Sequence, residues 1–452
     1  MPRSLPLASL IATIALLGAP DAAAFCGTYV SSYDEAPQNA ASEVAIVRQG
    51  SRTTLTVAND VTGDTRGFAM VVPVPEVLAE DAIHVVDPTV FDLLRGYSNP
   101  RQVRYECEDF DYESDTDTDA DTDADSDADT ADTDVEVEAQ YIVSEYDISI
   151  LSATESGSLV AWLQTNGYAV PDESERLLGE YIEGGAYFFA AQVREDAGVE
   201  PGDVLSPLQF SYESAPFGLP IRIGTLNSPG TQDLRIYAIS DYEQGRTAIA
   251  NYAEAAVDSD CMFQPEDGED LTAYYDRQLD EAYAAQAGAS WVTEYSWGNG
   301  NCDPCTGVIP DDNAMFTLGY QADYHVGMYY WFTRLRMRYT PETATQDLVL
   351  YQTNMHDTTQ MRFIDYAEDL EEYFPICNVG MVEDGGTCDD DGGPDDEDDD
   401  ETPFGEEDPT GADPLKAGTG CGCATPGGAS GALAGLLIAG LAVARRRSGV
   451  RS

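Results

Sequence analysis

Cys302 and Cys305, separated by two residues in the stretch CDPC, have the spacing that most often carries thiol chemistry. Such a pair can exchange disulfides or supply half of a zinc site. A redox pair needs a helix N-terminus after its first cysteine to lower the thiol pKa, but the prolines and glycine of residues 304–310 predict a loop. No second CxxC and no nearby histidine completes a zinc site. We therefore expect a structural disulfide or a turn, and no metal site, and keep thiol–disulfide exchange as the alternative.

The remaining cysteines are disulfide candidates, because nine cysteines in an exported chain favour disulfides. Cys421 and Cys423 belong to the C-terminal tail considered below. The other seven are an odd number, so one is free, pairs with a tail cysteine or bonds another chain. The sequence leaves the connectivity open, including a bond between Cys302 and Cys261. These seven candidates are Cys26, Cys107, Cys261, Cys302, Cys305, Cys377 and Cys388.

Arg334, Arg336 and Arg338 alternate along the stretch FTRLRMRY, so in a strand all three guanidinium groups share one face. Together they could hold a phosphate, a sulfate or an acidic sugar through bidentate hydrogen bonds. The same pattern is expected when arginines pair across strands with the surplus carboxylates of an acidic chain. We expect this pairing and keep anion binding as the alternative.

Histidines offer little further chemistry, since the chain has only His84, His325 and His356. His325 lies near Asp323 and near the arginine-bearing strand, which makes it the best of the three as a general base. The sequence contains no GxSxG, HExxH, P-loop or dinucleotide-binding glycine motif. We predict no catalytic residues, and a hydrolase without a recognisable motif remains an alternative.

Acidic residues dominate the composition, with 83 Asp and Glu against 22 Lys and Arg. Residues 114–134 hold ten Asp, residues 383–408 hold fifteen acidic residues, and neither segment contains Lys or Arg. The rest of the chain is still acidic. Such a surface repels nucleic acid and anionic lipid, which both need a basic footprint. We therefore exclude nucleic-acid binding.

The Asp-rich segment, residues 114–134, alternates its acids as some calcium loops do. Calcium, however, needs a loop that wraps the ion, usually with a glycine turn and a bidentate acid at its end, and the segment has neither. Its like charges and lack of apolar residues favour a solvated, disordered insertion. We expect no cofactor, with weak Ca²⁺ binding by this segment as the alternative.

An export signal is predicted at the N-terminus. Arg3 precedes an apolar stretch over residues 5–17, and three alanines at 22–24 supply a cleavage site before Phe25. Residues 1–24 are therefore expected to be a signal peptide. The rest of the chain would then meet an oxidising compartment, which suits disulfides.

Strand patterns alternate with amphipathic helices between residues 25 and 380, which predicts one α+β, strand-rich globular ectodomain. A strand resumes after residues 114–134, so we expect that segment to interrupt this domain. An acidic disordered stalk should follow over 383–420. Strands are predicted at 43–47, 52–57, 67–75, 137–153, 187–193, 208–212, 220–226, 234–239, 291–296 and 327–339, and helices at 88–95, 154–166, 171–183 and 270–286.

The tail, residues 421–452, contains the pair Cys421 and Cys423, an uncharged stretch over 427–444 and three arginines directly after it. As a helix, the uncharged stretch would span about 27 Å, just enough for a bilayer core. The positive-inside rule keeps the arginines cytoplasmic and the preceding chain outside. The whole pattern resembles the MYXO-CTERM sorting tails of myxobacteria and their relatives. That resemblance implies an envelope sorting protease as partner, and attachment to the membrane through lipid on a cysteine. An ordinary transmembrane helix is the alternative.

Seven blocks between Phe25 and Tyr373 occur in the order expected of one bacterial family, among them FAMVVPVP, LSPLQFSYES and TRLRMRYTPETATQDL. The chain resembles the exported bacterial family catalogued as domain of unknown function 2330. The resemblance implies an exported globular domain and no particular reaction. Where that family has RLH, this chain has Arg334, Leu335 and Arg336, so a role for a histidine there fails here.

These features together predict an exported protein displayed at the cell surface or outer membrane and facing outward. Its role is expected to be binding or structural rather than catalytic. A thiol–disulfide redox protein using Cys302 and Cys305, and an unrecognised hydrolase, are the alternatives. The sequence names no surface ligand.

We expect the native protein to begin at Phe25, to lack Arg445–Arg447 and to fractionate with the cell envelope, because both ends carry processing signals. Mass spectrometry of the terminal peptides and of the intact protein measures this. Replacing Cys421 and Cys423 by Ser should release the protein or leave it unprocessed, whereas Cys388→Ser should not. Finding the three arginines in the native protein would contradict the expected processing.

Overall fold

The computed structural model describes residues 28–31, 38–39, 42–58, 61–62, 68–104, 136–166, 174–194, 196–199, 205–227, 230–265, 269–286, 288–300, 309–322, 328–371 and 373–381. The predicted signal peptide, Asp-rich insertion, stalk and tail lie outside these residues. So do His325 and seven of the cysteines, namely Cys26, Cys107, Cys302, Cys305, Cys388, Cys421 and Cys423.

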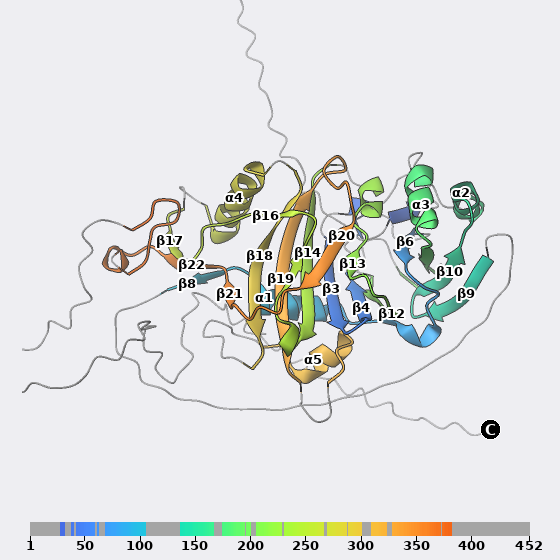
Figure 1. Ribbon diagram of the computed structural model, residues 1–452, viewed down its shortest axis with the longest axis horizontal. Coiled ribbons are helices and arrows are strands. Elements are labelled where there is room, and N and C mark those ends of the chain that lie inside the picture. Colours follow the sequence, from blue (N-terminus) through green and yellow to red (C-terminus); the bar gives the residue numbers. More distant parts are fainter. Residues whose placement is uncertain are drawn as a thin grey trace, which may run out of the picture.

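A nine-stranded sheet occupies the centre of the protein (Figure 1). Its order is β16-β18-β19-β14-β3-β4-β12-β7, and β21 pairs with β18. Most neighbours are antiparallel, but β3 runs parallel to β14. The strands are β3 (Ser42–Gln49), β4 (Arg52–Val57), β7 (Ile83–Val85), β12 (Leu208–Glu213), β14 (Gln232–Asp241), β16 (Ala253–Glu254), β18 (Ser290–Gly298), β19 (Tyr330–Tyr339) and β21 (Thr359–Gln360).

A five-stranded antiparallel sheet of order β1-β6-β11-β10-β9 packs against the larger sheet. Apolar side chains alternate along both sets of strands, so each sheet turns one apolar face inward. The rings of Phe189 and Phe210 stack 4.9 Å apart between the sheets. The strands are β1 (Thr28–Ser31), β6 (Phe68–Val74), β9 (Glu136–Val143), β10 (Tyr146–Ser152) and β11 (Tyr187–Val193).

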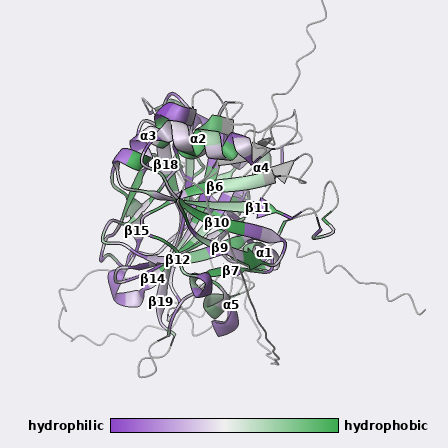
Figure 2. Cartoon of the chain, turned by 90° about the vertical axis from the view of Figure 1, so that its right-hand side faces the viewer, coloured by the Kyte–Doolittle hydropathy of each residue, from purple (hydrophilic) through white to green (hydrophobic). Residues whose placement is uncertain are grey.

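Helices cover the outer face of each sheet. α2 (Ser156–Thr165) and α3 (Ser174–Glu183) pack on the five-stranded sheet, and α1 (Thr89–Ser98) and α5 (Asp312–Thr317) pack on the nine-stranded one. Figure 2 shows mostly hydrophobic colour on the central strands, whereas the covering helices carry hydrophilic residues as well. Each of these helices buries one apolar stripe and exposes a polar one.

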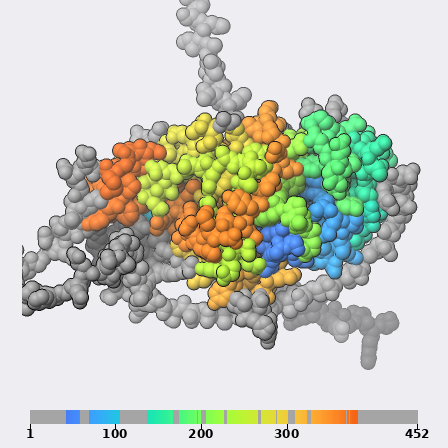
Figure 3. Space-filling model, viewed as in Figure 1, coloured from blue at the N-terminus to red at the C-terminus, as the bar shows by residue number. Residues whose placement is uncertain are grey.

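The described residues also form three smaller sheets. β13 (Gly218–Leu219), β20 (Leu348–Gln352) and β15 (Thr247–Ile249) form one, and β20 lies at the surface on the face drawn in Figure 3. The other two are β17 (Cys261–Phe263), β22 (Arg362–Asp365) and β8 (Arg101–Val103), and the pair β2 (Gln38–Asn39) and β5 (Val61–Thr62). Short 3₁₀ helices lie at η1 (Glu80–Ala82), η2 (Ile223–Asn227), η3 (Tyr242–Gln244) and η4 (Glu368–Leu370).

Most of the predicted elements are present, and the strand-rich character of the fold is confirmed. The hairpin around residues 48–51 is β3 and β4, and the four predicted helices are α1 to α4 within a few residues. The strand predicted at 220–226 is wrong: this segment contains the 3₁₀ helix η2 (Ile223–Asn227). α5 was not predicted, because six residues are too few for a helical period to appear. None of the helices in the described part of the chain is both long and apolar enough to cross a membrane.

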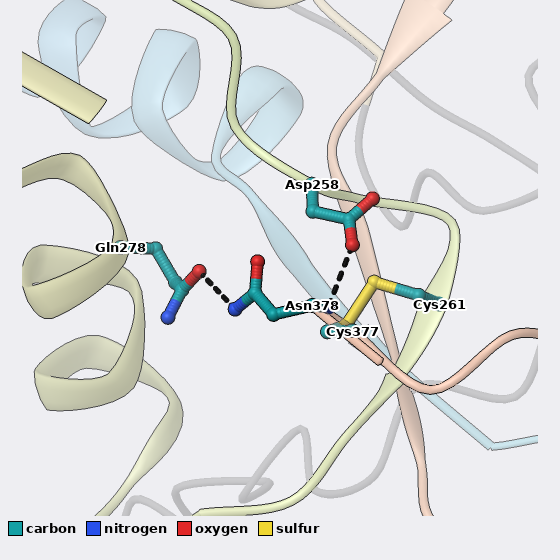
Figure 4. The surroundings of a disulfide bond; sticks show 5 residues. All are labelled: Asp258, Cys261, Gln278, Cys377 and Asn378. Atoms are coloured by element: carbon teal, nitrogen blue, oxygen red, sulfur yellow. Dashed lines mark hydrogen bonds between the residues drawn. A yellow bond between two sulfur atoms is a disulfide. The ribbon is translucent and has the colours of Figure 1, made fainter. Parts of the chain in front are cut away.

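A disulfide joins Cys261 on β17 to Cys377, 116 residues later in the chain (Figure 4). The backbone N–H of Asn378 donates to Asp258 at 2.7 Å, and the Asn378 amide donates to Gln278 of α4 (Leu271–Ala284) at 2.7 Å. The bond between Cys302 and Cys261 that the sequence left open is therefore wrong. The disulfide and its neighbours tie residues 373–381 to β17 and α4.

Replacing Cys377 by Ser should lower the free energy of unfolding by about 2 to 5 kcal/mol, because the disulfide closes a long loop in the unfolded chain. Urea unfolding followed by circular dichroism measures the loss. The double variant Cys261→Ser, Cys377→Ser should lose no more than either single one, since each change breaks the same bond. A non-reducing peptide map that joins Cys261 to another cysteine would contradict this pairing.

Candidate functional site

The three predicted arginines do share one face of β19, and that face is the outer one of the nine-stranded sheet. Arg336 binds Asp233 at 2.9 Å and Asp276 at 3.0 Å. Arg338 binds Asp233 at 2.7 Å and also pairs with Asp280. The carboxylates come from β14 and α4, so these arginines connect the sheet to the helix that covers it.

Arg334 is the most deeply buried of the three, and it pairs with Glu294, whose side chain is fully buried. The Tyr275 hydroxyl donates to Glu294 at 2.6 Å, and Arg334 donates to the side chain of Asn99. Burial and the Glu294 charge raise the pKa of Tyr275 well above its usual value, so the hydroxyl keeps its proton. The pair is thus supplied with partners from α4 and from the end of α1, as buried charges require.

A β-bulge places Glu294 and Tyr295 together on this face. The register of β18 against β19 shifts between Thr293 and Tyr295, so Glu294 is the extra residue. Without the bulge, strict alternation would turn Tyr295 toward the core between the sheets. With the bulge, Glu294 meets Arg334 and the Tyr295 ring packs in the outer core with Tyr97 and Phe332.

This Arg–carboxylate network has no surplus of positive charge. Each of the three arginines also lies over a tyrosine ring, with 5.3 to 5.7 Å between guanidinium carbon and ring centre. An anion would have to displace the protein's own carboxylates to reach these guanidinium groups. Within the described residues the network has five arginines and six acids: Arg95, Arg235, Arg334, Arg336 and Arg338 with Glu43, Asp92, Asp233, Asp276, Asp280 and Glu294.

A cleft of about 1580 Å³ lies where β7, the edge of the nine-stranded sheet, is next to β9. We call it the edge cleft. Its lining is polar and apolar in similar measure. It is lined by Arg52, Glu80, Asp81, Ile83, His84, Val85, Val86, Ile142, Val143, Ser144, Gln209, Ser211, Phe316, Thr317, Gly319, Tyr320, Gln321 and Ala322.

Hydroxyl and amide side chains of β4 and β12 lie beneath the edge cleft. Thr54 and Ser211 are paired in register, and their hydroxyls lie 3.1 Å apart. The Gln209 amide donates to the Thr56 hydroxyl at 2.9 Å and to the carbonyl of Thr317 at 2.8 Å. The same face of the sheet is apolar under α1, between this polar edge and the Arg–carboxylate network on β19.

The chain after α5 closes the edge cleft on one side. Gly319 has φ +87°, and a Cβ atom there would lie 2.7 Å from the Thr54 methyl group, so only glycine fits. Gln49 then holds the next residues: its amide donates to the Gln321 carbonyl at 2.9 Å and accepts from the Gln321 N–H at 2.7 Å. The Tyr320 hydroxyl donates to the carbonyl of Tyr329.

The other predicted site residues are not brought together. His84 is exposed in the edge cleft, and within the described residues no carboxylate or hydroxyl hydrogen-bonds to it. His356 is exposed elsewhere and hydrogen-bonds to the carbonyl of Tyr242 at 2.8 Å. Among the described residues, no cluster of His, Cys, Asp and Glu side chains has the arrangement of a metal site. Cys302 and Cys305 lie outside those residues, so the redox alternative stays a prediction.

One family model matches residues 20–351, a range that includes every cleft residue. Its description is "uncharacterized protein conserved in bacteria (DUF2330)". The chain belongs to this family. No curated protein and no solved structure matches it. The function of this DUF2330 chain therefore has to be inferred from the residues of the site itself.

The Arg–carboxylate network should make stability depend on acid pH. Burial alone would raise the pKa of Asp233, but the charges of Arg336 and Arg338 lower it to about 2. A carboxyl whose pKa falls on folding contributes stability above its unfolded pKa of about 3.9, and this is lost as pH falls toward 2; the contribution is about 2 kcal/mol.

Asp233→Asn should therefore remove part of the fall in stability between about pH 4 and pH 2, and should lower stability at pH 7 by about 3 to 5 kcal/mol, because it leaves two arginines without their shared partner. Urea unfolding across this pH range measures both effects. Asp280→Asn, which removes an exposed partner of Arg338, should cost less than about 1 kcal/mol. If the free energy of unfolding fell equally between pH 4 and pH 2 in the wild type and in Asp233→Asn, the lowered pKa of Asp233 would be refuted.

Proposed function

We propose that this DUF2330 protein is an exported, surface-displayed binding protein, and that the edge cleft is its ligand-binding site. The observation that carries the proposal is the cleft itself. It is a large open recess, and the hydroxyl and amide side chains beneath it are hydrogen-bonded to one another. Ligand sites are usually preformed recesses that combine apolar walls with a few fixed polar groups. Export and surface display rest on the predicted signal and sorting tail.

The polar groups favour a hydroxyl-rich ligand, that is, a saccharide. The Ser211 hydroxyl and the Gln321 carboxamide can each donate and accept hydrogen bonds, and the Gln209 side-chain oxygen can accept them. The half-exposed ring of Phe316 at the rim offers an apolar surface to the C–H face of a sugar ring. A protein facing outward from the envelope would meet polysaccharides on its own and neighbouring cells.

The arrangement of the cleft supports binding rather than catalysis. Nucleophilic or general-base catalysis needs a base within hydrogen-bond distance of the group it activates. Within the described residues of the cleft, the Ser211 hydroxyl is paired with another hydroxyl, and His84 is bonded to neither. A thiol–disulfide exchange protein or a hydrolase remains the rival class, and the experiment below separates them.

Isothermal titration of the native protein with neutral and acidic oligosaccharides should detect binding without release of reducing ends. Ser211→Leu, which replaces a floor hydroxyl by a larger apolar group, should weaken binding by about tenfold or more, the equivalent of one or two hydrogen bonds. Ser158→Leu makes the same change on the exposed side of α2 and should leave the affinity unchanged.

Two outcomes would overturn the proposal: hydrolysis of the saccharide, or equal binding by the wild type and Ser211→Leu. Insulin reduction by the wild type, lost in Cys302→Ser and in Cys305→Ser, would instead favour the redox alternative.

A further inference from the structure

Arg52 is the one arginine in the described residues whose side chain makes neither a hydrogen bond nor an ion pair. Its Nε atom is buried and has no acceptor. Twelve other described arginines each pair with a carboxylate, and Arg48 and Arg101 donate to backbone carbonyls. In a chain with 83 acidic residues, a described arginine whose side chain has no partner of any kind is the exception that needs a physical reason.

Arg52 lacks a partner although a carboxylate lies directly opposite it in the sheet. Arg52 begins β4, lies opposite Glu213 in register, and is on the same face of the sheet as Thr54 and Thr56. An ion pair with Glu213 would be the ordinary result across neighbouring strands. Instead, the Glu213 carboxylate accepts from the Ser51 hydroxyl at 2.7 Å, and Arg52 lines the edge cleft.

We propose that Arg52 is the specificity-determining residue of the edge cleft and binds the carboxylate of an acidic saccharide, a uronic acid. This inference rests on the proposed function and adds the ligand class to it. The two terminal nitrogens of a guanidinium each have an N–H that points the same way, so they can donate to the two oxygens of one carboxylate. The Arg52 side chain is half-buried and lines the cleft, so these terminal groups would gain the acceptor that the described residues do not supply.

The charges around Arg52 favour a ligand with single, separated carboxylates over a phosphorylated one. Glu80 and Asp81 line the same cleft, and Arg52 is its only arginine or lysine. A phosphate group carries close to two charges at neutral pH and would be repelled more strongly by these two acids and by the acidic protein as a whole. The neighbouring hydroxyls and amides match the hydroxyls of the sugar ring.

The test uses the native protein with trisaccharides of glucuronic, galacturonic or mannuronic acid, each compared with its carboxyl-reduced neutral form. The wild type should bind at least one acid form about 10- to 100-fold more tightly than the matched neutral sugar, the effect of a charged hydrogen-bonded pair. Arg52→Met should remove this preference and leave the affinity for the neutral form unchanged. Arg52→Lys keeps the charge but loses the paired N–H donors of the planar guanidinium. It should therefore keep only part of the preference for the acid form.

Arg176→Met is the matched control, because it removes the same charge from an exposed position on α3 outside the cleft. It should keep the full preference, and melting temperatures of all variants check that they fold. A preference that survives Arg52→Met, or a wild type that binds acid and neutral forms equally, would overturn the role of Arg52 while leaving the proposed function standing. No binding of either form would overturn both. Tighter binding of inorganic phosphate or a sugar phosphate than of any uronate would overturn the uronate assignment.

Discussion

Burial of the Glu294 carboxylate against Arg334 is the constraint on which the outer half of this protein depends. Removing a charge from water costs several kcal/mol, so neither group can stay in the interior without the other and without further hydrogen bonds. Strand β18 supplies the carboxylate at its bulge, Tyr275 of α4 donates to it, and Asn99 after α1 accepts from Arg334. The positions of two strands and two covering helices are therefore coupled through one ion pair. Shifting β18 by one residue would place Glu294 in the apolar core between the sheets.

Charge pairing also explains how a strongly acidic chain can use its few cations. Most described arginines are bound by carboxylates, and the network on β19 leaves no guanidinium without one. Such arginines hold the fold together and are poorly available to a ligand. Arg52 differs because the carboxylate opposite it binds a serine, and because the edge cleft beside it is open to solvent. In an acidic protein, clustered basic side chains are a poor guide to an anion-binding site, because carboxylates already neutralise them. A basic side chain without a carboxylate partner is the better guide.

The arginine face and the edge cleft differ in how far the sequence could predict them. Alternation within FTRLRMRY places three arginines on one face of a strand, because the period of a strand is two residues. Their partners could not be predicted, since Asp233 and Glu294 come from other strands and Tyr275 from a helix. The edge cleft left no signal in any one segment: Arg52, Ser211 and Gln321 lie far apart in the chain and meet only through strand pairing and the turn at Gly319. The pairing of Cys261 with Cys377 was likewise one of many possible connectivities.

By itself, the sequence determined the local features: the β3–β4 hairpin, the four longer helices, the strand-rich class and the family. These depend on the spacing of hydrophobic residues, on turn residues and on sequence blocks typical of the family. Each of these signals can be read within short stretches of chain. The tertiary structure alone decided which charges meet, where the bulge lies, and which arginine is left facing an open cleft. Those outcomes depend on burial and on strand order, and both are properties of segments that pack together although they are distant in sequence.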